Sequence, residues 1–307
     1  NFNLQYTTET SKGTIQSPAS FMGAWSAGGA LIQGRQLIGG AGTQNAGIAF
    51  GGEVNANVSC TEEYSGTAWA AGGAMIIARR SLGSAKAGTQ NASLAFQGQV
   101  NSKSTCTEEY NGSSWSSGGA ASTSVRDSVG AGTQNAASSI GGQSNASPDN
   151  EDNTEHYNGT AWANSATLIT GRFSAGVAGT QNSALVFGGQ TPTYLSTAEG
   201  YNGISWERLN SLTEAKSTLG GTGTMTAAIA FGGNTPTILS STEEWNGISW
   251  VNSCNMITAR KDLGSAGTQN EALAFGGSTP TISSTLTEEY TKNDIVPYTT
   301  CVWSSGA

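Results

Sequence analysis

The sequence predicts an all-β protein, a six-bladed β-propeller with four antiparallel strands in each blade. Three observations predict this fold class. The phrase Gly-Thr-Gln-Asn recurs about every 45 residues, tryptophans recur with the same period, and each unit divides into four short segments bounded by turn residues. Units that repeat with such a period stack so that neighbours share one core.

The clearest marker of the repeat is the glycine of Gly-Thr-Gln-Asn. It stands at positions 42, 88, 132, 179 and 267, and a degraded copy at 223–226 fills the fifth place. Successive glycines are therefore 46, 44, 47, 44 and 44 residues apart. So regular a period predicts one supersecondary unit copied six times. We expect the phrase on or near the innermost strand of each blade, where its amides line a wet axial channel or bond the neighbouring blade.

The second unit shows the expected strands in order. Residues 69–77 open it with a tryptophan, 87–91 and 93–96 follow, and 106–110 come after a loop. Short segments bounded by Gly, Asn or Ser are typical of strands and turns. Asn111-Gly112 then supplies the positive φ angles of a tight hairpin turn. The Thr-Glu-Glu-Tyr segment before it and the tryptophan segment behind it are therefore expected to pair antiparallel.

The tryptophans at 25, 69, 115, 162, 206 and 250 keep the same register. Each is expected to bury its ring between adjacent blades rather than to stack on a ligand.

Trp303 follows after 53 residues and could form the outermost strand of the last blade, but the segment 25–31 looks like an outermost strand too. Either residues 1–31 dock beside the closing blade, or they help to form an incomplete seventh blade. We assign 1–24 to a segment that docks on or closes the propeller, and 25–307 to the six-repeat propeller.

Composition and charge exclude several classes of function. The net charge is −8 and only 11% of residues are charged, without the basic stripe that nucleic acid requires. No apolar run approaches the roughly 20 residues that span a bilayer, so membrane insertion is not expected.

Cys60 and Cys106 occupy equivalent places in adjacent units, too far apart for a disulfide, while pairing of Cys254 with Cys301 is left open. No Cys-x-x-Cys spacing indicates zinc.

Charged residues recur in every unit without indicating catalysis. We expect one cation per blade to join the Thr-Glu-Glu-Tyr carboxylates in a ring of exposed ion pairs that fixes blade geometry, each worth about 0–1 kcal/mol. His156 is the only histidine and replaces a glutamate of that phrase, which indicates neutral variation. The sequence therefore predicts no catalytic, cofactor-binding or metal-ligating residues. The expected cations are Arg35, Arg80, Arg126, Arg172, Lys216 and Arg260.

The copies differ most in the loops that follow Gly-Gly. Units four to six carry Thr-Pro-Thr loops, whereas units one to three carry Asn-containing loops, of which the third is the longest and is acidic. Because strands alternate in direction, all six loops are expected on one face, split into two chemically distinct halves. Rigid scaffolds present binding residues on such loops; neutral drift between duplicated triplets is the alternative. The candidate binding residues are Asn55, Asn57, Asn101, Lys103, Asp149, Glu151, Asp152, Thr191, Tyr194, Thr235, Ile238, Thr279 and Ile282.

Each unit resembles a kelch repeat, with an inner strand, an apolar strand ending in Gly-Gly, a strand with an aromatic residue, a turn and a tryptophan. The resemblance covers residues 25–303 and implies the propeller fold. Units two and three depart from it with Phe96-Gln97-Gly98 and Ile140-Gly141-Gly142. The matching phrases are Phe50-Gly51-Gly52, Phe187-Gly188-Gly189, Phe231-Gly232-Gly233 and Phe275-Gly276-Gly277.

The near-identical copies are also similar to kelch-like repeats of structural and tail-fibre proteins of large tailed bacteriophages. This resemblance implies a non-enzymatic protein of the virion surface, in a tail fibre, neck or capsid. It would belong to a homo-oligomeric or larger assembly and bind other virion proteins or a host-surface glycan or receptor. The alternatives are a secreted, extracellular bacterial adhesin or lectin-like propeller and, more remotely, a propeller enzyme.

Overall fold

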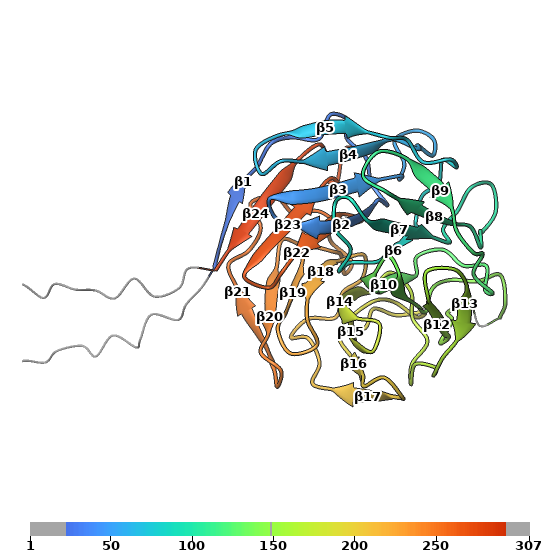
Figure 1. Cartoon of the computed structure of the whole chain (residues 1–307). Coiled ribbons are helices and arrows are strands. Elements are labelled where there is room, and N and C mark those ends of the chain that lie inside the picture. Colours follow the sequence, from blue (N-terminus) through green and yellow to red (C-terminus); the bar gives the residue numbers. More distant parts are fainter. Residues whose placement is uncertain (1–22, 148, 293–307) are drawn as a thin grey trace, which may run out of the picture.

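Six four-stranded antiparallel sheets surround a central axis as the blades of a propeller (Figure 1). The computed structural model describes residues 23–147 and 149–292, which contain twenty-four strands. The predicted all-β class, six blades and four strands per blade are confirmed. Those two ranges contain no helix that is long and apolar enough to cross a membrane.

Every blade has the same strand order from the axis outward. We number the blades one to six by their innermost strands, which are β2 (Gly39–Thr43), β6 (Gly83–Ser84), β10 (Val129–Thr133), β14 (Gly176–Thr180), β18 (Gly220–Gly223) and β22 (Gly264–Gly267). The second strands are β3 (Ala46–Phe50), β7 (Ser93–Phe96), β11 (Ala136–Ile140), β15 (Ser183–Phe187), β19 (Ala228–Phe231) and β23 (Glu271–Phe275). The third strands are β4 (Thr61–Tyr64), β8 (Thr107–Tyr110), β12 (Thr154–Tyr157), β16 (Ala198–Tyr201), β20 (Thr242–Trp245) and β24 (Thr287–Thr291). The outermost strands are β5 (Trp69–Gly72), β9 (Trp115–Ser117), β13 (Trp162–Asn164), β17 (Trp206–Leu209), β21 (Trp250–Ser253) and β1 (Ala24–Ala27).

The N-terminal strand β1 closes the ring. It pairs antiparallel with β24, with Trp25 opposite Tyr290, and so forms the outermost strand of blade six (Figure 1). Residues 24–27 thus fill the outermost position of blade six, for which the sequence offered both the segment 25–31 and Trp303. Trp303 and residues 1–22 lie outside the described residues. Because blade six combines both ends of the repeat array, the ring cannot open without breaking the β1–β24 hydrogen bonds.

Small residues near the axis allow the blades to converge. The Phe187 ring lies between Gly176 of its own blade and Gly221 of the next, and a Cβ atom on Gly221 would come within 2.6 Å of that ring. Phe275 packs in the same way against Gly40, where a Cβ would lie 2.4 Å away. The innermost strands are therefore glycine-rich because the phenylalanine of each Phe-Gly-Gly phrase occupies the space that side chains would need.

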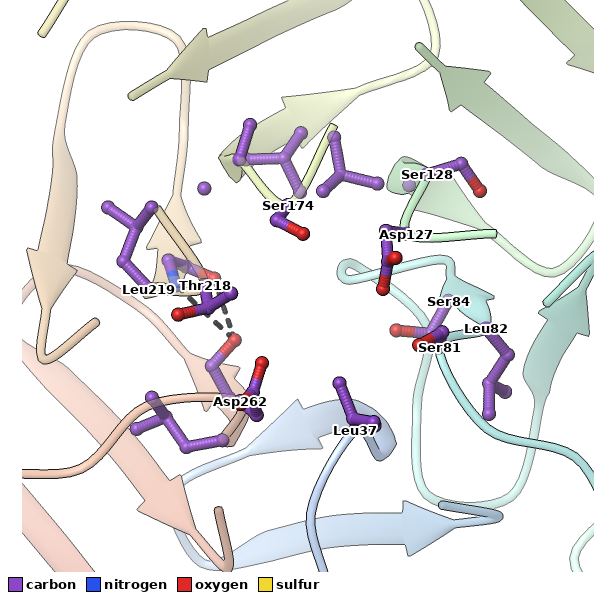
Figure 2. A pocket seen from close by; sticks show the side chains of 18 of the residues that line it. Leu37, Ser81, Leu82, Ser84, Asp127, Ser128, Ser174, Thr218, Leu219 and Asp262 are labelled. Carbon is purple, nitrogen blue, oxygen red and sulfur yellow. Dashed lines mark hydrogen bonds between the residues drawn. The ribbon is translucent and has the colours of Figure 1, made fainter. Parts of the chain in front are cut away.

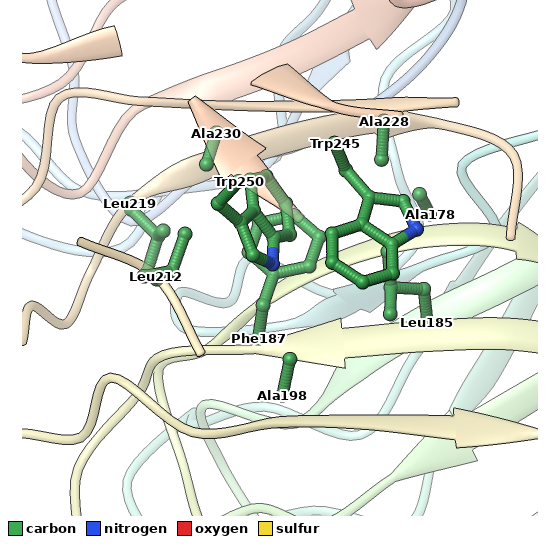
Figure 3. Close-up of a cluster of buried hydrophobic side chains, with 10 residues drawn as sticks. All are labelled: Ala178, Leu185, Phe187, Ala198, Leu212, Leu219, Ala228, Ala230, Trp245 and Trp250. Atoms are coloured by element: carbon green, nitrogen blue, oxygen red, sulfur yellow. The ribbon is translucent and has the colours of Figure 1, made fainter. Parts of the chain in front are cut away.

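The tryptophans pack between blades, as predicted. Trp115 lies edge-on to Phe50 of the preceding blade with ring centroids 4.9 Å apart, and its Nε1 donates to the Thr61 hydroxyl at 2.9 Å. At the contact between blades four and five, Trp250 packs on Phe187 and on Trp245 (Figure 3). At the other five interfaces the threonine equivalent to Thr61 accepts a hydrogen bond from the indole nitrogen of the next blade. At the interface between blades four and five, Ala198 replaces this threonine, and the Trp250 nitrogen has no partner.

The glutamine of the repeated phrase bonds the neighbouring blade, one of its two expected roles. Gln90 Nε2 donates to the carbonyl oxygens of Gly47 and Tyr64 at 2.9 and 2.8 Å. Gln44, Gln134, Gln181 and Gln269 make the equivalent pair of bonds. The phrase is therefore an inter-blade fastener, which explains its uniformity without any chemistry at the site.

The predicted ring of ion pairs exists, but it is buried and two of its expected cations were wrong. In blade two the cation is Arg79, whose Nη2 lies 3.3 Å from Glu108, and in blade three Val125 takes the place. Arg80 and Arg126 stand one position further from the tryptophans of their units than the buried cations do, and both are partly exposed. The buried pairs are Arg35–Glu62, Arg79–Glu108, Arg172–Glu199, Lys216–Glu243 and Arg260–Glu288.

The cysteines follow the expectation as far as the structure describes them. Cys60 and Cys106 are free thiols in adjacent blades. Cys301, the partner considered for Cys254, lies outside the described residues.

Candidate functional site

One residue of each blade adopts a left-handed backbone conformation next to the axis. These residues stand twelve positions after the tryptophans that open the units, and their φ angles lie between 52° and 56°. Non-glycine residues rarely hold this conformation unless the surrounding structure imposes it. The six residues are Leu37, Ser81, Asp127, Ser174, Thr218 and Asp262.

These six residues form a closed circle of backbone hydrogen bonds, which we call the axial ring. The amide of each member donates to the carbonyl oxygen of the member in the preceding blade, for example Ser81 to Leu37 at 3.0 Å and Thr218 to Ser174 at 2.7 Å. The amide of Leu37 closes the circle by donating to Asp262 at 2.9 Å. The bonds run around the axis and join all six blades. The left-handed backbone is therefore the conformation that this circle requires.

The side chains of the axial ring surround an opening on the axis (Figure 2). Asp127 and Asp262 belong to blades three and six and therefore face one another across the axis. Burial raises the pKa of Asp127. Burial, together with the negative charges of Asp127 and Glu53, raises the pKa of Asp262 to about 6. The ring thus holds two opposed carboxylates whose charge is incompletely compensated.

A depression of about 350 Å³, which we call the mouth, lies above the axial ring. Arg80 Nη1 contacts Glu53 at 2.5 Å, and Arg126 donates to Gln99 and Gln143 at 2.8 Å each. Phe173 also lines the mouth. Arg80 and Arg126 were expected as structural cations of the blades, but they line the polar mouth instead.

A second cavity continues along the axis below the ring, with a volume of about 100 Å³. Lys86 lies in it, and burial lowers the pKa of this amine to about 8. Its Nζ reaches past blade one to the carbonyl oxygen of Ser265 in blade six, at 3.4 Å. We call this space the axial cavity.

The candidate binding loops after Gly-Gly surround the mouth and form what we call the loop face. Three of their predicted residues fasten one loop to the next. Asn57 Nδ2 donates to two carbonyl oxygens of the second unit's loop at 3.0 Å each. Lys103 donates to a carbonyl oxygen of the third unit's loop. The Tyr194 hydroxyl accepts a bond from Asn234 at 3.1 Å. These side chains therefore hold neighbouring loops of this face together.

The acidic loop of unit three is largely occupied with its own structure. Asp149 accepts a bond from Gln143 at 2.6 Å. Glu151 and Asp152 bind neighbouring segments through their backbones, and the Asp152 side chain is exposed. Among the described residues no group of three or more His, Cys, Asp or Glu could hold a metal ion.

The remaining candidates are spread around the loop face rather than gathered in one site. Asn101 is exposed and Ile238 is half-buried. Asn55, Thr279 and Ile282 line one depression where units one and six meet, and Ile282 is 67% exposed there. The amides of Thr191, Thr235 and Thr279 each close a turn within their own loops.

The sequence analysis did not identify the axial ring, the residues above it or Lys86 as a site. A signal was present, because the ring position varies among Leu, Ser, Asp and Thr while most innermost-strand positions after it carry small residues.

His156, treated as a neutral variant, packs edge-on to Tyr201 with ring centroids 5.5 Å apart, and burial lowers its pKa.

Fold and site together define a six-bladed β-propeller with a polar mouth at the centre of one face. No protein-family model matches the chain, and no curated protein sequence matches it. Among solved structures it is similar to one titled "Structure of YjhT", with a TM-score of 0.71 and 13% sequence identity. The similarity covers 85% of this chain and 95% of that one. At this identity the likeness shows the fold alone.

Proposed function

We propose that the chain is a non-enzymatic binding module of a bacteriophage virion, located in a tail fibre, neck or capsid surface. Its loop face would contact another virion protein or a host-surface glycan. The phage-like uniformity of the repeats motivates the virion assignment. The kelch-like repeat pattern and the six-bladed ring are compatible with it.

One observation carries the binding role: the variable loops lie on the face opposite to the ends of the described range, at Gly23 and Lys292. The segments before the innermost strands and the loops after Gly-Gly bridge one another, as at Gln36 and Glu53, and so share the loop face. Ala24 pairs with Thr291, and the Lys292 amide donates to Asn270 in a hairpin turn of the other face. The loop face is therefore not the face at which residues 23 and 292 leave the propeller.

Rigidity supports the same role. Inter-blade glutamine bonds, tryptophan contacts and the axial ring repeat around the circle, and Asn57, Lys103 and Tyr194 fasten adjacent loops. Loops held in this way lose little conformational entropy when they bind a partner. The depression at Asn55 and Ile282 is one part of this face that presents exposed side chains.

The test uses the intact chain and two matched surface variants. Labelled protein is incubated with host cells, with a glycan array and with phage particles that lack it. We expect binding to cells, a glycan or particles. Ile282→Asp on the loop face should weaken this binding, whereas Thr160→Asp, in a hairpin turn on the opposite face, should not. Absence of binding in all three assays would overturn the proposal, and so would equal sensitivity to both variants.

A further inference from the structure

We propose that the axial cavity binds a small zwitterion, with its ammonium group between Asp127 and Asp262 and its anionic group on Lys86. This site would lie on the axis rather than in the loops, and its existence does not depend on a virion partner. The proposal assigns to the centre of the propeller a ligand of the ω-amino acid class.

The first observation is an irregularity that places a cation in the cavity. From the tryptophan to the repeated glycine there are nineteen positions in unit two (69 to 88) but seventeen in unit one (25 to 42). The two extra residues interrupt the innermost strand after Ser84. Ala85 then bridges to Gly130 in parallel, and the Lys86 amide donates to Gly130 at 3.2 Å. Lys86 is the one charged residue in the innermost-strand segments, which otherwise carry small or apolar residues and threonine.

The second observation is that this cation has no counter-charge. None of the ion pairs of the described residues includes Lys86. Its bond to Ser265 is long, at 3.4 Å, and uses one of three ammonium protons. The lowered pKa of the amine agrees with a buried charge that lacks a partner. An anionic group in the cavity would supply that partner.

The third observation is the complementary charge at the other end of the cavity. Asp127 and Asp262 face one another across the axial ring (Figure 2), and both carboxylates have raised pKa values because of burial. Their neighbours Arg126 and Lys261 lie 3.5 and 3.9 Å away at the rim. A ligand ammonium group on the axis would approach both carboxylates at once. The mouth and the axial cavity share the ring residues, so a ligand entering from the mouth meets the carboxylates first.

The spacing of the two ends limits the ligand's length. Asp262 precedes Ser265 by three residues, and the left-handed backbone at Asp262 shortens this stretch, so their levels lie at most roughly 10 Å apart at a strand rise of about 3.3 Å per residue. Two charge-assisted hydrogen bonds of about 2.8 Å each then leave at most roughly 4 Å between the ligand's charged groups. This upper bound favours a short amino acid of up to four carbons over 6-aminohexanoate.

Calorimetric titration of the intact protein tests the proposal with glycine, β-alanine, 4-aminobutanoate and 6-aminohexanoate, and with butylamine and butanoate as single-charge analogues. We expect glycine, β-alanine and 4-aminobutanoate to bind better than 6-aminohexanoate. Lys86→Met and Asp262→Asn should each weaken that binding about ten- to hundred-fold, the range for a lost charge-assisted bond. Arg208→Met and Asp152→Asn remove the same charges from exposed positions and should leave it unchanged.

Two results would overturn the proposal. One is the absence of binding by every zwitterion to a protein whose circular dichroism and thermal transition are intact. The other is binding that survives Lys86→Met unchanged, or that butylamine or butanoate reproduces, because either would remove the requirement for both charges. Lys86→Met replaces a buried charge by an apolar side chain of similar length, so it is expected to fold.

Discussion

The Tyr110 hydroxyl donates a hydrogen bond of 2.5 Å to the Glu63 carboxylate of the preceding blade. Tyr157 and Tyr64 make the same bond to Glu109 and Glu289, at 2.6 and 2.5 Å. The second carboxylate of Thr-Glu-Glu-Tyr therefore acts between blades, whereas the first neutralises a cation within its own blade. Adjacent residues of a strand point to opposite faces of the sheet, which separates the two roles.

Replacement of Tyr110 by phenylalanine should weaken this contact without opening a cavity. We expect the free energy of unfolding to fall by about 1–2 kcal/mol, as for the loss of a hydrogen bond to a charged group. Urea denaturation followed by tryptophan fluorescence measures the change. Tyr194→Phe, which removes a hydroxyl from a surface loop, should cost less.

Alkaline pH should destabilise the protein through the same tyrosines. Burial and the hydrogen bond to Glu63 raise the pKa of Tyr110 to about 12, from 10.0. The folded state therefore keeps a proton that the unfolded state loses, and stability falls as the pH rises from about 10 to about 12. Urea unfolding at a series of pH values should show a steeper decline for the wild type than for Tyr110→Phe. Parallel declines would contradict the assignment.

The buried ion pairs should be costly to break from one side. Arg260 Nη2 lies 2.9 Å from Glu288, and both side chains are almost fully buried. Arg260→Met should lower the free energy of unfolding by about 3–5 kcal/mol, because it leaves a buried carboxylate without a cation. Leu263→Met, a buried position of the same blade, removes no charge and nearly conserves volume, so it should cost less than about 1.5 kcal/mol. Equal losses in urea unfolding would argue against the ion pair.

Blade four offers a stabilising substitution. The Trp250 indole nitrogen is buried without a partner, because Ala198 stands where the other blades have a threonine or its equivalent acceptor. Ala198→Thr should supply the hydroxyl and raise stability by about 1 kcal/mol. The matched change Thr107→Ala removes the bond from Trp162, which is 2.9 Å long, and should lower it by a similar amount. Thermal denaturation of both variants checks the pair, and a destabilised Ala198→Thr protein would refute the explanation.

Three departures from the repeat compensate one another between blades four and five. Gly200 replaces the second glutamate, Trp245 the tyrosine and Met225 the glutamine, and a Cβ on Gly200 would lie 2.1 Å from Met225. Gly200→Glu alone should destabilise by several kcal/mol, whereas the triple variant with Trp245→Tyr and Met225→Gln should recover most of the loss. A double-mutant cycle measures this coupling. Additive effects would show that the three positions are independent.

The axial carboxylates should reduce stability at neutral pH. The pKa of Asp262 is raised to about 6, so the folded state binds its proton more tightly and loses stability as the pH rises from about 4 to about 6. Asp262→Asn should therefore stabilise the protein by about 1–2 kcal/mol at pH 7 and have little effect near pH 3.5. Urea unfolding at the two pH values distinguishes this from a general effect of the substitution.

Periodicity was sufficient to predict much of the fold. The regular spacing of the tryptophans and glycines predicted six units, and Asn-Gly turns predicted their hairpins, because these features depend on local backbone geometry and on burial that repeats. The burial of Trp115 between blades and the role of Gln90 followed from the same repetition. The cation of blade two was misassigned because Arg79 and Arg80 are adjacent, and side-chain burial distinguishes them only in the folded ring. In blade three Arg126 is adjacent to the buried Val125, which stands in the place of the cation.

The candidate site was less predictable, since it depends on residues from every blade. By itself the sequence determined the unit, its strands and the number of copies. Only the tertiary structure decided that Ala24–Ala27 closes blade six, that Asp127 faces Asp262 across the axis, and that Lys86 enters the axial cavity below them. The physical reason is that closing the ring brings together residues far apart in the chain, and their distances depend on the radius and order of the blades rather than on any local pattern.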